Sequence, residues 1–230
     1  MGRSAVLGAV LGYSIGTFPT ADLVAKRVSG GTIDLRRAGS GNPGGANAAK
    51  LLGRKAGYTV MAGDIAKGAL ASGVGALVAG PAGAHVAGTA SVVGHCFPVW
   101  NGFRGGKGVA ASVGQCLATF PAYFPVDIAV AGLTAASPRW KQRTFAATLV
   151  SCTAWVLGSV LWWRKRWPNL WGPRPTAGLP AAAAVSSAII AYKFLSATPP
   201  AIPTATPHAS ATATPHASRP AGPAAQRQPA

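Results

Sequence analysis

Five long stretches of the sequence contain no formally charged residue, and this feature restricts the possible folds more than any other. The stretches cover residues 4–21, 68–103, 108–126, 144–163 and 175–192. A helix that crosses a bilayer needs about 20 mostly apolar residues. Ala, Gly, Val and Ser dominate here over Leu, which suits close contact between helices in lipid. A soluble helical protein would need polar helix faces, and these runs have almost none. The sequence therefore predicts a multispanning membrane protein.

The turn signals divide these stretches into an all-α, polytopic bundle of six to seven transmembrane helices. We expect spans at 4–25, 56–80, 84–98, 144–163 and 176–195, and two short segments within 108–137. Pro121 separates the two short segments, and Gly80-Pro81-Ala82-Gly83 predicts a tight turn. The number of transmembrane helices stays open. If every segment crosses the bilayer, the basic run Arg164-Lys165-Arg166 lies outside, against the positive-inside rule.

The charge is strongly one-sided: 21 Lys and Arg oppose four Asp and no Glu, for a net charge of +17. Such a charge could indicate nucleic acid, but the basic residues form no stripe interleaved with aromatic residues, so no nucleic-acid partner is predicted. They cluster instead between apolar runs. One arginine precedes the first span and four basic residues follow it within residues 26–37, which predicts an external N-terminus and a cytoplasmic first loop. A cleaved signal peptide is the competing interpretation, and we favour a retained helix.

Composition also predicts the domain organisation. Pro, Ala, Thr and Ser dominate from about Ser196, and Thr-Ala-Thr-Pro-His-Ala-Ser occurs at both 204–210 and 212–218. Such sequence cannot bury a core. We therefore expect a transmembrane domain over 1–196 and a disordered tail over 197–230. The three cysteines are isolated in apolar surroundings and predict neither a disulfide framework nor a metal site.

A cationic glycine-rich loop, Arg104-Gly105-Gly106-Lys107-Gly108, follows the third span. Glycines let backbone N–H groups approach an oxyanion, and Lys107 adds a full charge. The P-loop pattern fails because Asn101 replaces its first glycine and Gly108 its hydroxyl residue. The loop still predicts phosphate binding, with a plain membrane-edge turn as the alternative. His95 lies beside it, and we expect a functional role for this histidine.

Residues 104–108 are called the second glycine loop, because a first glycine turn, Gly39-Ser40-Gly41-Asn42-Pro43-Gly44, lies in the basic loop after the first span. It contains G-x-G-x-x-G, but the dinucleotide fingerprint requires a preceding buried strand, which is absent. We interpret it as another anion-binding turn in which Ser40, Asn42 and Asn47 offer polar contacts. Asp64 and Lys67 share a helix face, which fits a structural ion pair and substrate contact equally.

The two loops together resemble one family, the membrane-embedded bacterial acyl-phosphate:glycerol-3-phosphate acyltransferases, the PlsY family. The matching segments are Phe18-Pro19, Leu23-Val24-Ala25-Lys26, Asp34-Leu35-Arg36, Gly39 to Gly44, Asn47, Asp64-Ile65-Ala66-Lys67-Gly68, Gly94 to Val99 and Phe103 to Ala110. The resemblance implies about seven spans, no metal or nucleotide cofactor, and a bacterial inner-membrane location with both loops facing the cytoplasm. It implies transfer of a fatty acyl group from acyl phosphate to glycerol 3-phosphate, which gives lysophosphatidic acid.

Residue chemistry fits that reaction. An acyl phosphate carries its own leaving group, so positioning and charge stabilisation suffice without a nucleophilic serine. Few acids are present to compete for the cations. We predict catalytic roles for Lys107, His95 (as an optional proton relay) and Ser40. The predicted phosphate- and substrate-binding residues are Arg36, Gly39, Gly41, Asn42, Gly44, Asn47, Lys50, Lys67, Arg104, Gly105, Gly106 and Gly108.

The sequence departs from the family pattern at several positions. Ala46 replaces a threonine, Lys50 replaces an arginine and so loses bidentate phosphate geometry, and Ala111 replaces another threonine. The family's C-terminal His-Arg-x-Asn-Ile motif has no counterpart, since Tyr192-Lys193-Phe194-Leu195 leads directly into the tail. A second hypothesis is therefore a non-catalytic membrane protein that binds phosphate or phospholipid headgroups. A transporter is a distant third, because the sequence lacks repeated broken-helix halves.

Overall fold

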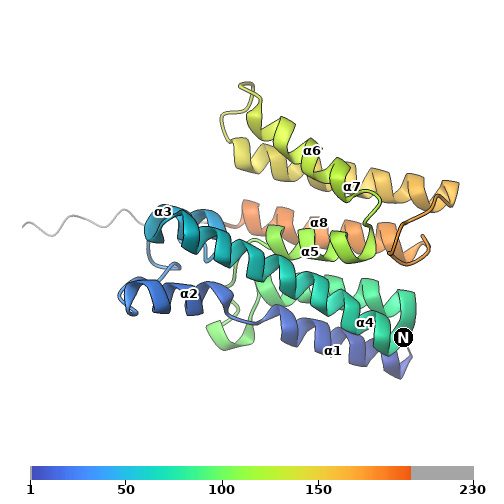
Figure 1. Cartoon of the computed structure of the whole chain (residues 1–230), viewed down its shortest axis with the longest axis horizontal. Helices are drawn as coiled ribbons and strands as arrows, with labels where there is room; N and C mark the ends of the chain where they lie inside the picture. Colours follow the sequence, from blue (N-terminus) through green and yellow to red (C-terminus); the bar gives the residue numbers. More distant parts are fainter. Residues whose placement is uncertain (1, 198–230) are drawn as a thin grey trace, which may run out of the picture. The chain divides into compact units, whose positions relative to one another are not determined.

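The structure, a computed structural model, describes residues 2–197, and every regular element within that range is helical. The predicted tail lies outside the described residues except for Ala197. The elements are α1 (Arg3–Gly16), α2 (Thr20–Ser29), α3 (Gly45–Leu52), α4 (Arg54–Cys96), the 3-10 turn η1 (Val99–Asn101), α5 (Val109–Thr119), α6 (Phe124–Ala136), α7 (Arg143–Lys165) and α8 (Gly178–Leu195). Figure 1 shows α1, α4, α5, α7 and α8 running roughly side by side.

The first predicted span is interrupted. The sequence predicted one helix over 4–25, but α1 ends at Gly16 and α2 begins at Thr20. Pro19 explains the break, because the residue before a proline is disfavoured in helical conformation and proline donates no backbone hydrogen bond. Residues 17–19 therefore lie outside both helices, and the backbone carbonyl of Phe18 can accept a hydrogen bond from Lys67 of α4.

Helix α4 is a hairpin of two antiparallel halves. Its backbone leaves helical geometry at Ala79 and Gly80, and Gly80 has a φ of 61°, which favours glycine. Gly75 and Gly83 then face each other so closely that a Cβ on either would overlap the opposite backbone. The predicted turn at Gly80-Pro81 is confirmed. Because the halves are antiparallel, residues near the start and the end of α4 become neighbours.

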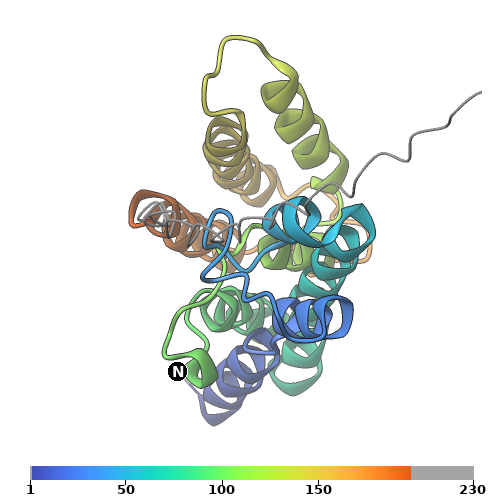
Figure 2. The ribbon, with the colours of Figure 1, turned by 90° about the vertical axis from the view of Figure 1, so that its left-hand side faces the viewer.

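Small residues hold the neighbouring helices against this hairpin. A Cβ on Gly12 of α1 would overlap Ala87 of α4, and a Cβ on Gly68 of α4 would overlap Ala111 of α5. Such close backbone approach is typical of helix contacts in lipid. Figure 2 shows α1 on one side of the hairpin and the α6–α7 pair on the other side of α5 and α8.

The predicted break near Phe120-Pro121 is confirmed, since α5 ends at Thr119 and α6 begins at Phe124. Phe120 stacks on Tyr123, and both belong to a buried cluster with Trp155 of α7 and Leu179 of α8. This aromatic cluster attaches the α6–α7 pair to the rest of the bundle.

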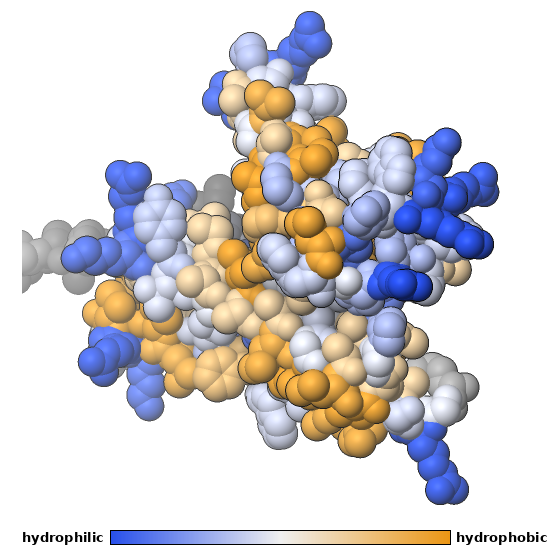
Figure 3. All heavy atoms as spheres, turned by 45° about the vertical axis from the view of Figure 1, so that its right-hand side comes forward, coloured by the Kyte–Doolittle hydropathy of each residue, from blue (hydrophilic) through white to orange (hydrophobic). Residues whose placement is uncertain are grey.

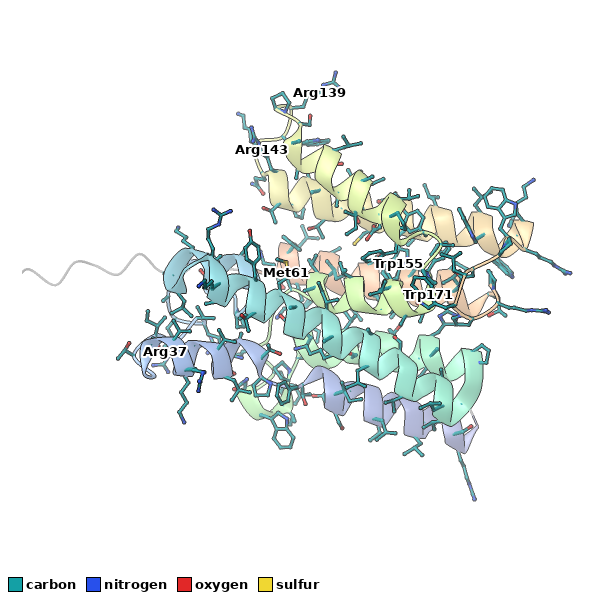
Figure 4. All side chains as sticks on the ribbon, in the orientation of Figure 1. Arg37, Met61, Arg139, Arg143, Trp155 and Trp171 are labelled. Atoms are coloured by element: carbon teal, nitrogen blue, oxygen red, sulfur yellow. The ribbon has the colours of Figure 1, made fainter. Side chains whose placement is uncertain are left out.

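The helices meet the requirements of a multi-pass membrane protein. Four segments are long and apolar enough to cross a bilayer, and one of them contains the α4 hairpin; α5 and α6 are shorter apolar helices. Counting the halves of α4 separately gives seven apolar helices in residues 2–197, in agreement with the predicted six to seven. On the face shown in Figure 3, strongly hydrophilic side chains project at the edges and apolar side chains cover much of the surface between them. Arg37 and Arg139, from two different loops, and Arg143, the first residue of α7, lie at the same end of the helices (Figure 4).

Candidate active site

A pocket lies where the α1–α2 break meets the α4 hairpin and the second glycine loop. Its empty volume is about 280 Å³, part of it open to solvent. Residues 17–22 form one wall, at the N-terminal end of α2, where the partial positive charge of a helix favours anions. The remaining lining residues are Gly16, Arg36, Pro43, Asp64, Lys67, His95, Pro98, Asn101, Gly105 and Gly106. Five of the predicted site residues therefore share one pocket.

A buried group of three ionisable side chains, all from α4, forms the floor of this pocket. Lys67 Nζ lies 2.9 Å from Asp64 Oδ1, and His95 Nδ1 lies 3.5 Å from the same oxygen. Each of the three residues is at most 7% exposed. Lys67 also donates a hydrogen bond of 3.2 Å to the carbonyl of Phe18. Of the two roles that the sequence left open, the ion pair is present, and Lys67 also lines the pocket. Its contact with a substrate stays a prediction.

Arg36 joins the two glycine loops. Its guanidinium forms an ion pair with Asp22 of α2, and its Nε donates to the carbonyl of Arg104 at 2.7 Å. Asn101 donates to the other carboxylate oxygen of Asp22 at 3.1 Å. Two of the four acids in the chain, Asp22 and Asp64, thus line the pocket and neutralise its two cations. The expectation that scarce acids leave the cations free was wrong here.

The second glycine loop closes the end of α4. Gly105 N–H donates to the carbonyl of Cys96 and Gly106 N–H to that of His95, both at 3.1 Å. These amides satisfy helix-terminal carbonyls that would otherwise lack partners, so they are not the free anion donors that the sequence predicted. A Cβ on Gly106 would overlap the His95 ring. Glycine is therefore required for close packing on the histidine.

The first glycine turn is organised by Asn47, at the start of α3. Its amide nitrogen donates to the carbonyls of Leu35 and Ala38, both at 3.0 Å, and its Oδ1 accepts from Ser40 N–H at 2.9 Å. Asn47 is 3% exposed. The N–H groups of Gly41 and Gly44 are also used internally, by the carbonyls of Ala38 and Asn42. Asn47 thus holds the turn together, and its predicted contact with a substrate stays a prediction.

Lys107 lies just beyond the pocket lining and contacts α8. Its Nζ is 4.1 Å from the ring centroid of Phe194. Burial, with a further contribution from the charge of Lys193, lowers the pKa of Lys107 below the usual value for lysine. Gly108, with a φ of 87°, approaches Cys96, Val92 and Ile190 so closely that a side chain would not fit. The loop is thereby fixed against α8.

The other predicted residues lie around the pocket and do not line it. The side chains of Ser40, Lys50 and Arg104 are exposed. Gly39, Gly41, Asn42 and Gly44 shape the first turn, and their predicted binding roles stay predictions.

The sequence analysis missed Asp22, Asn101 and the residues of the helix break. Phe18-Pro19 carried the signal for that break, because a proline inside an apolar run predicts a helix boundary. Thr20 opens α2, and its buried hydroxyl has no partner among the described residues.

The arrangement can hold a small polar anion between the start of α2 and the cations Arg36 and Lys67. Within residues 2–197, no group of three His, Cys, Asp or Glu side chains could hold a metal ion. At this pocket the chain offers the positive charge of Arg36 and Lys67 and a shaped wall of backbone from residues 17–22.

Comparison with known proteins gives a consistent result. The family model described as "Glycerol-3-phosphate acyltransferase" matches residues 6–198. A glycerol-3-phosphate acyltransferase from Exiguobacterium sibiricum is 49% identical over 51% of this chain; the match spans 56% of that relative's length.

Two solved structures of PlsY (YgiH), an integral membrane glycerol 3-phosphate acyltransferase, share the fold. The glycerol 3-phosphate form has a TM-score of 0.67 and 28% identity, covering 84% of this chain and 88% of that one. The lysophosphatidic acid form has a TM-score of 0.64 and 27% identity, covering 83% and 88%. With the family model matched over nearly all of the described residues, this chain belongs to the glycerol-3-phosphate acyltransferase family.

Proposed function

We propose that this protein transfers a fatty acyl group from acyl phosphate to glycerol 3-phosphate. The observation that carries the proposal is the pocket, which combines a helix N-terminus, Arg36 and Lys67 beside the loop that presents Lys107. Such a site suits a small phosphate ester. Relatives named glycerol-3-phosphate acyltransferase, and a similar structure solved in glycerol 3-phosphate and lysophosphatidic acid forms, support the same substrates.

The reaction needs no group from outside the substrates. A hydroxyl oxygen of glycerol 3-phosphate attacks the acyl carbonyl carbon, the bond from that carbon to the phosphate oxygen breaks, and the phosphate leaves. The hydroxyl proton passes to the departing phosphate. The products are lysophosphatidic acid and inorganic phosphate. The protein contributes orientation and positive charge where negative charge develops, which are large terms in enzymatic rate enhancement.

A turnover assay tests this proposal directly. Purified full-length protein in detergent receives palmitoyl phosphate and glycerol 3-phosphate, and lysophosphatidic acid and inorganic phosphate are both measured. We expect equal amounts of the two products, dependent on both substrates. Well-folded protein that forms no lysophosphatidic acid above background rejects the proposal. It then favours the alternative of a non-catalytic protein that binds phosphate or phospholipid headgroups.

We also infer that the two glycine loops face the cytoplasm. The end of the helices that carries them also carries most of the basic residues in loops and at helix ends, including Arg37, Arg139 and Arg143. Cytoplasmic loops of membrane proteins are enriched in Lys and Arg. After removal of the native cysteines, Ser40→Cys and Arg104→Cys should react with an impermeant thiol reagent only in permeabilised cells. Arg3→Cys, at the opposite end, should react in intact cells; the reverse pattern contradicts this topology.

A further inference from the structure

The cations on the two sides of the second glycine loop differ in how their charge is balanced. On the pocket side, Arg36 pairs with Asp22 and Lys67 pairs with Asp64. On the α8 side, neither Lys107 nor Lys193 forms an ion pair with a carboxylate of the described residues. The pocket thus has compensated charge, whereas the α8 side has two uncompensated ammonium groups.

Aromatic rings bring these two lysines to one region. Lys107 Nζ lies 4.1 Å from the ring centroid of Phe194, the residue after Lys193. Lys193 Nζ lies 5.0 Å from the ring centroid of Phe97, the residue that follows α4. Gly108 packs on Ile190, one helical turn before Phe194. The last turn of α8 and the glycine loop therefore hold both ammonium groups beside the end of α4.

Bringing like charges together is unfavourable, and burial increases the cost. Both lysines are partly buried, and burial and the charge of Lys193 lower the pKa of Lys107. Contact with an aromatic face stabilises a cation only modestly and does not neutralise it. A dianion held between the two ammonium groups would remove the repulsion, as a carboxylate does for each cation in the pocket.

We propose that Lys193 binds phosphate and forms, with Lys107, a two-lysine site for the phosphate group of the acyl phosphate. This inference rests on the proposed function for the identity of the ligand. The surroundings distinguish the two substrates: Phe97, Phe194 and Ile190 make the two-lysine site apolar. An acyl chain suits such a site, while the polar pocket suits glycerol 3-phosphate. Each phosphate then has its own pair of cations near the second glycine loop.

Kinetics of Lys193 variants test the assignment. Lys193→Ala should raise the KM for palmitoyl phosphate about 10- to 100-fold, the effect of losing a hydrogen bond to a charged group. The KM for glycerol 3-phosphate should change much less. Lys193→Arg keeps the charge and should give a smaller rise. Lys141→Ala is the matched control, because this exposed lysine lies in the α6–α7 loop. It should leave both KM values unchanged.

Binding of inorganic phosphate, measured by isothermal titration on the full chain, separates this inference from the proposed function. If wild-type protein shows no turnover but Lys193→Ala weakens phosphate binding, the two-lysine site stands and the acyltransferase proposal fails. If wild-type protein turns over and Lys193→Ala changes neither phosphate affinity nor the KM for palmitoyl phosphate, the two-lysine site is rejected. If Lys193→Ala unfolds the protein, the same phosphate affinity and KM are measured for Lys193→Met, which keeps the apolar part of the side chain over Phe97.

Discussion

The imidazole ring of His95 fills the space that a side chain on Gly106 would occupy. The ring lies against the Gly106 backbone, and Gly106 N–H donates to the carbonyl of His95 itself. His95 Nδ1 in turn lies 3.5 Å from Asp64 Oδ1. The glycine loop, the histidine and the buried carboxylate of α4 are therefore one packed unit, and a change at any of them should move the loop.

Gly106→Ala tests this coupling. The added methyl must displace the His95 ring, and overpacking of a tight site typically costs about 1–3 kcal/mol. We expect a lower Tm in detergent and a loss of turnover. Gly132→Ala is the control: nothing lies within 4 Å of a Cβ there, and the residue is inside helix α6. Alanine should maintain or slightly raise the Tm at that position. Equal effects of the two variants would contradict the coupling.

The buried ion pair of α4 gives a second prediction. Asp64→Asn leaves the ammonium of Lys67 without its carboxylate in a nearly inaccessible position, and breaking such a pair costs about 3–5 kcal/mol. The double variant Asp64→Asn/Lys67→Met removes both charges. We expect its Tm to lie above that of Asp64→Asn alone. A double variant less stable than the single one would show that Lys67 stabilises the fold mainly through other contacts, such as its hydrogen bond to the carbonyl of Phe18.

Most of the fold was predictable from the sequence. Apolar length predicted the helices, and the Gly-Pro and Phe-Pro signals predicted the turns at Gly80 and Phe120. The break after Gly16 was missed because the run over 4–25 is long enough for one span, and the effect of Pro19 was read only as a motif match. Pro19 therefore sets the boundary between α1 and α2, which the hydropathy of this run does not reveal.

The site was predictable as a set of residues but only partly as a set of contacts. Arg36, Lys67 and His95 do line one pocket. The sequence could not reveal that the N–H groups of Gly105 and Gly106 serve the end of α4, because that depends on where the helix ends in space. Pairing of Arg36 with Asp22 depends likewise on the break between α1 and α2. Side-chain charge is visible in a sequence, but the partner that neutralises it is set by the fold.

Asn47 provides a prediction that separates bracing from substrate contact. Asn47→Ala leaves Ser40 N–H and two carbonyls without partners, and an unsatisfied buried group costs about 1–3 kcal/mol. We therefore expect a clear fall in Tm. Lys50→Ala, on the exposed face of the same helix, should leave the Tm unchanged. If Asn47→Ala raises the KM for glycerol 3-phosphate without lowering the Tm, the residue is a substrate contact instead.

The tail gives a prediction that rests on the sequence alone. Its Pro, Ala, Thr and Ser composition lacks the apolar residues needed to pack on the bundle. Deletion after Ala197 should therefore leave expression, Tm and turnover unchanged. A fall in Tm on deletion would mean that the tail docks on the helices.

Lys107 gives the prediction with the largest expected effect. Its ammonium is placed by the glycine loop and the ring of Phe194, and loss of a donor aimed at developing charge typically slows turnover by about 100- to 1000-fold. Lys107→Ala should show this loss with little change in Tm, since the side chain is only partly buried. Lys107→Arg should restore part of the activity, because a planar guanidinium does not replace a compact ammonium in a tight turn.

The pH dependence of these variants supplies the decisive measurement. Because burial and Lys193 lower the pKa of Lys107, its ammonium loses the proton at a lower pH than an ordinary lysine. The charged form binds the anion, so kcat/KM for palmitoyl phosphate should fall as the pH rises through that pKa. Lys107→Arg should remove this alkaline decline, since a guanidinium stays protonated, and Lys193→Met should move the decline to higher pH by removing the neighbouring charge. A wild-type profile that stays flat on the alkaline side, or a Lys107→Ala variant with full activity, would exclude Lys107 from the reaction.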